Sequence, residues 1–148
     1  MNENGVITNI EQLTPERLTN IFKKKGFLSH GKVSKIIIKN SLETETSNYH
    51  FLDLNFSNDA QTESVSPEIY VTISKPNDLA KLLGEHEVNF YSIVAETMNE
   101  MPILTCYDAA FSEETGLSHI IIETLSKTHI NLMDAPLPPL KIYCERAI

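Results

Sequence analysis

Glu87 is the side chain whose position in this sequence most clearly indicates a chemical role. It falls four residues after Leu83 and three before Phe90, on the apolar face predicted for a helix over Pro76–Asn99. A carboxylate on a buried stripe needs a cation or a hydrogen-bond donor, because burying it alone costs several kcal/mol. Two alternatives stay open from the residues alone: Glu87 serves a binding site, or it leans to the edge of the stripe and stays hydrated. The stripe itself is predicted to comprise Leu79, Leu82, Leu83, Phe90, Val94 and Met98.

Hydroxyl groups gather in a polar run, Asn40–Tyr49 (NSLETETSNY), which shows no apolar pattern and is predicted to be a loop between two strands. Thr44, Thr46 and Ser47 could donate hydrogen bonds to phosphate oxygens. The segment Glu43–Asn48 has no glycine, and a Walker-type or Rossmann-type phosphate loop needs glycine for close backbone approach, so both are excluded here. The alternative is that the run is a solvated hairpin loop without a ligand.

Metal and nucleophile chemistry find no support in the sequence. The two cysteines, Cys106 and Cys144, have no metal-ligand spacing, and neither His119 nor His129 has such a spacing with a cysteine or a paired acid. The motifs G-x-S-x-G and H-E-x-x-H are absent. We therefore predict no metal site and no catalytic nucleophile, and we expect reduced thiols, as in the cytoplasm.

Composition narrows the class of protein further. The 148 residues are expected to form one domain, and 41% hydrophobic with 22% charged residues is typical of a globular protein. A formal net charge of −8 argues against nucleic acid and against an anionic membrane surface as partners. No apolar stretch approaches the roughly 20 residues of a membrane span. The start, MNENGVITNIEQL, lacks the regions of a signal peptide, so a cytoplasmic location is predicted.

The elements that would position Glu87 begin with a helix. Thr14 is predicted to cap it, Pro15 to occupy its first position, and Gly26 to supply the left-handed residue at its end. Three strands are expected to follow, at Val33–Lys39, His50–Phe56 and Glu68–Lys75.

The third of these strands (EIYVTISK) has two unlike faces. Ile69, Val71 and Ile73 are predicted to join the core, whereas the opposite face is predicted to line a cleft with Tyr70, Thr72 and Ser74. Lys75 has the core-side parity, but it lies at the strand end, where a lysine can reach solvent.

After the helix that carries Glu87, a strand and loop are predicted over Met101–Phe111, then a turn closed by Gly116 and a buried strand over Leu117–Glu123. A connector follows, and Lys141–Ile148 is predicted to begin a short helix. The predicted fold class is therefore α+β: an antiparallel five-stranded sheet with a helix packed on it.

This order of elements resembles the small lobe of a kinase-like fold. The stretch EHEVNFYSIVAETMNEMPILTCYDAAFSEETGLSHIIIETLSKTH resembles the aminoglycoside and choline phosphotransferase family, and the opening LTPERLTNIFKKKGFLSHGKVSKI is similar to the start of such proteins. The resemblance covers most of the chain and lies in order and spacing rather than in one specific motif.

The resemblance implies a role for several residues. Glu87 matches the helix glutamate that orients a lysine on the third strand, which in turn contacts the nucleotide phosphates. Glu123 and Leu125 match the hinge, whose backbone groups bind the adenine edge, and Ser47 belongs to the loop over the phosphates. The implied cofactors are ATP and magnesium, and the implied substrate is a small molecule with a hydroxyl group.

Two departures from the family pattern matter. The lysine position is occupied by Thr72, and Lys75, three residues on, faces the other way unless a bulge intervenes. The family's catalytic aspartate, metal ligands and acceptor site belong to a large second lobe, of which residues 127–148 would be only the connector and the start.

Two hypotheses follow. The chain is the ATP-binding lobe of a phosphotransferase, with no catalytic residue of its own and inactive at this length, or it is a non-catalytic remnant or binding module built on the same lobe. Self-association is expected at the exposed surface beside the hinge.

Overall fold

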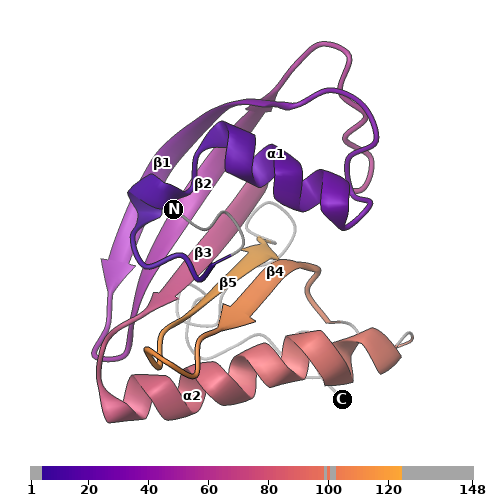
Figure 1. Ribbon diagram of the computed structural model, residues 1–148. Helices are drawn as coiled ribbons and strands as arrows, with labels where there is room; N and C mark the ends of the chain where they lie inside the picture. Colours follow the sequence, from indigo (N-terminus) through magenta and orange to yellow (C-terminus); the bar gives the residue numbers. More distant parts are fainter. Residues whose placement is uncertain (1–4, 99, 101–102, 125–148) are drawn as a thin grey trace, which may run out of the picture.

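The structure, a computed structural model, describes residues 5–98, 100 and 103–124 (Figure 1). Five strands form one antiparallel sheet in the order β1-β2-β3-β5-β4. Helix α1 (Pro15–Lys24) packs on one face and α2 (Asp78–Asn89) on the other. The strands are β1 (Val33–Glu43), β2 (Ser47–Phe56), β3 (Glu68–Ser74), β4 (Cys106–Phe111) and β5 (Ser118–Glu123). The predicted α+β class with five antiparallel strands is confirmed.

Helix α1 begins and ends as its sequence predicts. The Thr14 hydroxyl accepts a hydrogen bond from the Arg17 backbone N–H at 3.1 Å, and Pro15 occupies the first position. Gly26 has a φ of 80°, the left-handed conformation expected after the helix. The apolar face of α1 buries Leu18 and Phe22 against the sheet.

The prediction that Asn40–Tyr49 is a loop is wrong for most of its length. Strand β1 continues to Glu43 and β2 starts at Ser47, so only residues 44–46 connect them. Ser41 pairs with His50 across the two strands, and Leu42 with Tyr49. A register shift between Ile38 and Asn40 breaks the alternation that would have marked a strand in the sequence.

Strand β3 separates two apolar clusters, and its predicted core face is confirmed. Ile69, Val71 and Ile73 are buried together with Leu18 and Phe22 of α1. The smaller cluster, on the other face, joins Val88 of α2 to two residues of β5, Ile120 and Ile122. Alternate residues of the central strands therefore face different helices.

The stripe predicted to be buried on the helix that carries Glu87 is wrong for every residue except Met98, which is partly buried. The large apolar residues of this helix lie on its outer side, and the residues turned to the sheet are Ala80, Gly84 and Val88. Small side chains face the sheet because the helix lies close to β5 at Gly84, where no larger residue fits. The exposed residues are Leu79, Leu82, Leu83, Phe90, Ile93 and Val94.

Beyond Asn89 the helical path continues as a π-helical turn (Phe90–Val94) and a 3-10 turn (Ala95–Thr97), close to the predicted end near Asn99. Strand β4 starts only at Cys106, later than predicted, and Gly116 closes the β4–β5 turn with a φ of 70°. The connector and the helix predicted at Lys141–Ile148 lie almost wholly outside the described residues. In the described part, no helix has both the length and the apolar character needed to cross a membrane.

Candidate functional site

A small polar cavity lies where the β1–β2 hairpin, β3, α2 and β5 meet. Its volume is about 60 Å³, and Glu87 stands at its α2 side. Hydroxyl-bearing side chains dominate the wall: Thr46, Ser47, Tyr49, Thr72, Ser74 and Ser118. We call this space the hydroxyl pocket. Its donors and acceptors suit a ligand rich in oxygen, such as a phosphate or a polyol.

Gly84 fixes how closely α2 approaches the sheet beside this pocket. A Cβ atom at Gly84 would lie 2.2 Å from the Ser118 hydroxyl oxygen, which is well inside van der Waals contact. The flanking Ala80 and Val88 are buried against the same strand layer. The glycine thus lets the helix lie low enough for Glu87 to reach the pocket wall.

Glu87 occupies the boundary between the buried side of α2 and its exposed apolar side. The residue as a whole is exposed, yet partial burial of its carboxyl group raises the pKa of Glu87. Within the described residues, no ion pair or side-chain hydrogen bond is found for this carboxylate. The sequence left two alternatives for Glu87: a role in a binding site, or a hydrated position at the edge of the helix. In the structure, Glu87 leans to the edge of the helix and also lines a cavity.

Thr72 faces the same pocket, as its parity on β3 predicts. Its side chain is almost fully buried, and it stands where the resemblance requires a lysine. Among the described residues that line the pocket there is no lysine, arginine or histidine. The described part of the pocket therefore carries one carboxylate and no cation.

Lys75 does not supply the missing charge. Its ammonium group forms an ion pair with Glu43 at the end of β1, and that hydrogen bond, with the lysine charge, lowers the pKa of Glu43. The Lys75 backbone N–H donates to Thr46 O at 2.8 Å. Lys75 thus fastens the hairpin to the end of β3 and is not paired with Glu87.

The two hinge residues lie apart from the hydroxyl pocket. Glu123 is tied to Thr105, with its backbone N–H donating to Thr105 O at 3.0 Å and its Oε1 accepting from Thr105 N at 2.8 Å. Leu125 lies outside the described residues. The structure therefore brings Ser47, Thr72 and Glu87 together and leaves the adenine contacts and the expected self-association as predictions.

Magnesium does not fit the residues of this pocket. Within residues 5–98, 100 and 103–124, no group of three or more histidine, cysteine, aspartate or glutamate side chains is placed to hold a metal ion. The pocket itself has a single carboxylate, whereas magnesium is usually held by carboxylates together with substrate phosphates. Cys106 is not an alternative reactive group, because burial and the Asp108 charge raise the pKa of its thiol to about 12.

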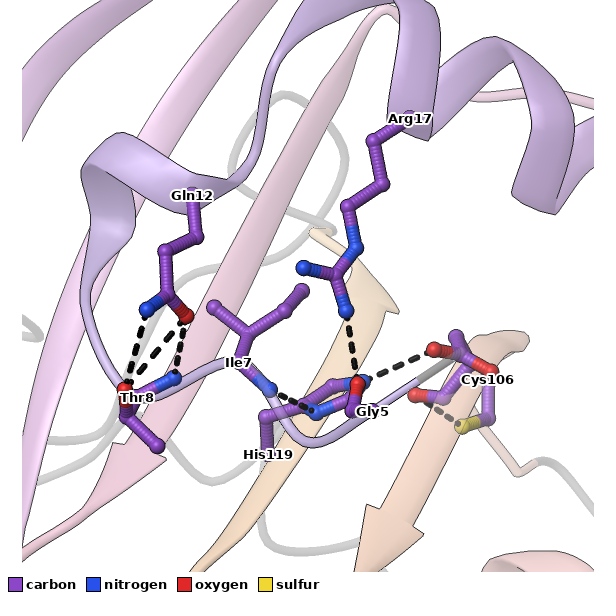
Figure 2. A network of polar contacts seen from close by, with 8 residues as sticks. Gly5, Ile7, Thr8, Gln12, Arg17, Cys106 and His119 are labelled. Carbon is purple, nitrogen blue, oxygen red and sulfur yellow. Dashed lines mark hydrogen bonds and ion pairs between the residues drawn. The ribbon is translucent and has the colours of Figure 1, made fainter. Parts of the chain in front are cut away.

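Sequence reasoning missed a buried pair on the other face of the sheet. His119 on β5 is 1% exposed, and its Nε2 lies 2.7 Å from Asp108 Oδ2 on β4 (Figure 2). Burial alone would raise the pKa of Asp108, but the hydrogen bond with His119, together with the charges of Lys25 and Arg17, lowers it overall. The available signal was a histidine inside the apolar run LSHIIIE, opposite an aspartate of the preceding strand.

Several residues of the hydroxyl pocket were also missed. Ser118 and Gly84 line it, and a glycine in the middle of a predicted helix was a usable signal of close packing.

Comparisons with protein-family models, with curated proteins and with solved structures found no match to this chain. The case for the site therefore rests on its residues and their geometry.

Proposed function

We propose that this chain is the nucleotide-binding lobe of a small-molecule phosphotransferase, and that the hydroxyl pocket receives phosphate oxygens of ATP. One observation carries the proposal: Ser47, Thr72 and Glu87, which the resemblance assigns to the phosphate side of a nucleotide site, line one cavity. The order of elements, with α2 between β3 and β4, agrees with the small lobe that the resemblance implies.

Each of these residues has a distinct part in the proposed site. Ser47 and the neighbouring Thr46 donate hydroxyl hydrogen bonds to phosphate from the hairpin. Thr72 donates a neutral hydrogen bond where the family has an ammonium group. A neutral donor is roughly half as strong as a charge-assisted one, so binding is expected to be weak.

The size of the pocket sets a second condition on binding. A cavity of about 60 Å³ holds only part of a phosphate chain, so the triphosphate must lie along its mouth. Of the connecting residues 44–46, Thr46 lines the pocket, and this connection is held by the Asn77 side chain donating to Glu45 O at 3.1 Å and by Lys75 N–H donating to Thr46 O. These two contacts would have to shift if the hairpin opened further.

Restoring the absent cation tests the proposal. Thr72→Lys puts an ammonium group opposite Glu87, and one charge-assisted contact is expected to tighten Mg-ATP binding roughly tenfold. The measurement is a thermal-shift titration with Mg-ATP, with adenosine as a phosphate-free ligand. Thr115→Lys, in the exposed β4–β5 turn, is the matched control for added positive charge.

The alternative function is a non-catalytic remnant or binding module on the same lobe. It is favoured by Thr72 and by the single carboxylate of the pocket. The same titration separates the two: a rise of the midpoint in the wild type supports a working nucleotide site. A rise only in Thr72→Lys supports a remnant that has lost it, and unmoved midpoints in both contradict nucleotide binding.

A further inference from the structure

The N-terminal segment, residues 5–13, is held against the sheet by a contact that involves a titratable group. Ile7 is fully buried, and its backbone N–H donates to His119 Nδ1 at 2.9 Å (Figure 2). Leu13, at the other end of the segment, is also buried in the same cluster. Docking of this segment therefore completes the core on the α1 face.

The hydrogen bonds around His119 define its protonation state. Nδ1 accepts from Ile7, so it carries no proton, and Nε2 must hold the proton that it shares with Asp108. The imidazole is therefore neutral when the segment is docked. A proton added to Nδ1 would place two N–H donors face to face in a site that solvent does not reach.

We propose that His119 is a pH-operated latch: the neutral imidazole holds residues 5–13 docked, and protonation at Nδ1 releases them. The proposal is independent of nucleotide binding, since none of these groups lines the hydroxyl pocket.

The charges around the imidazole favour release of residues 5–13 without unfolding of the sheet. Asp108 on β4 faces Nε2, and its pKa is lowered, so it stays ionised as the pH falls and still holds the imidazolium. Arg17 on α1 and Lys25, directly after it, act on Asp108 and oppose added positive charge. Lys24 lines a separate cavity of about 200 Å³, which Arg17, Lys25 and Asp108 also line. Strand β3 presents apolar residues to this face, and Glu11 of the segment is exposed.

The other described contacts of the segment do not titrate. Arg17 Nη2 donates to Gly5 O at 2.6 Å, and Gln12 bonds within the segment to Thr8 (Figure 2). A pH-dependent release of Ile7 can therefore be assigned to His119.

The test is amide hydrogen exchange of Ile7 in the full chain as the pH is lowered, normalised by the intrinsic exchange rate at each pH. We expect protection of Ile7 to fall by up to about tenfold per pH unit as the pH is lowered towards the release midpoint, as one-proton linkage requires. Protection of Val71 in β3 reports on global unfolding and is expected to fall only at lower pH, because Asp108 stabilises the imidazolium in the released but still folded chain. Loss of both together would overturn the proposal.

Three variants sharpen this test. His119→Asn keeps an acceptor for Ile7 but cannot gain a proton there, so its Ile7 protection should not change with pH. Asp108→Asn removes the charge that stabilises the imidazolium and should move the release to lower pH. His50→Asn changes a histidine whose Nδ1 contacts only the exposed Ser41, and it should behave like the wild type.

Two results contradict the latch. In one, His119→Asn loses Ile7 protection on acidification as the wild type does. In the other, Asp108→Asn releases the segment at the unchanged midpoint. If His119→Asn does not fold, the shift in Asp108→Asn alone decides, because a merely structural aspartate would lower protection at every pH without moving the midpoint.

Discussion

The two faces of the sheet are packed to different degrees. On the α1 face, Phe22 and Tyr107 are buried, their rings meeting edge to face at 5.1 Å. On the α2 face, a small cluster around Val88 lies beside a polar cavity, and the helix turns its large apolar residues outward. The first face is a completed core, and the second face is where groups remain accessible to a ligand.

This difference indicates how the fold divides its tasks. The α1 face supplies the stability of the described chain, because burial of large apolar side chains is the main favourable term in folding. The α2 face leaves hydroxyl groups and a carboxylate around a cavity, which is the composition of a binding site rather than of a core. Local stability is expected to be lower there.

The largest predicted effect compares one phenylalanine from each face. Phe22→Ala is expected to lower the free energy of unfolding by about 3–5 kcal/mol, since Phe22 is fully buried. Phe90→Ala is expected to cost less than about 1 kcal/mol, because Phe90 is 36% exposed and lies outside both buried clusters. Urea unfolding measures both. Equal losses would mean that the exposed side of the π-helical turn after α2 is covered in solution.

A smaller effect is expected at the glycine that sets the α2 face. Gly84→Ala drives a Cβ atom into Ser118, and overpacking costs about 1–3 kcal/mol, partly offset by up to about 1 kcal/mol of helix propensity. Ser118→Ala in the same chain should relieve much of the loss, because the clash at 2.2 Å is with its hydroxyl oxygen. Glu85→Ala, on the exposed side, is the control and should not destabilise. A stable Gly84→Ala single variant would show that α2 is free to move away from β5.

The smallest predicted effect concerns the pH dependence of the α2 face. Burial raises the pKa of Glu87 in the folded chain, so folding favours its protonated form. The contribution of Glu87 to stability should therefore decline as the pH rises from below its unfolded pKa through its folded one. Glu87→Gln removes this dependence and should be more stable than the wild type at neutral pH, by less than about 1 kcal/mol because the group is partly exposed. The difference between the two unfolding curves should vanish in acid.

Features set by local chemistry were predictable from the sequence, and those set by packing distances were not. The cap at Thr14 and the alternation of β3 depend on neighbouring residues, and both are confirmed. The prediction that the apolar stripe of this helix is buried failed for a physical reason. Periodicity shows that a helix has an apolar side, but it does not show that this side meets the sheet. The close approach at Gly84 decided that question.

The candidate site shows the same limit. The parity of Thr72 predicted a cleft wall, and the resemblance implied that Glu87 lies beside that position; the structure brings both residues to one pocket. Lys75 could not be assigned from the sequence, because its partner Glu43 was predicted to lie in a loop and instead ends a strand. Asp108 and His119 meet across a hairpin at a separation of eleven residues, which depends on a register shift between Cys106 and Asp108.

The most direct test of the account is a titration of Mg-ATP into the isotope-labelled chain, followed by the backbone amide signals. We predict saturable shifts at Ser47, Thr72 and Gly84 around the hydroxyl pocket, larger in Thr72→Lys, and none at Phe22 on the α1 face. Shifts confined to the α1 face, or no shifts at millimolar Mg-ATP in either protein, would contradict the assignment of this pocket to a nucleotide.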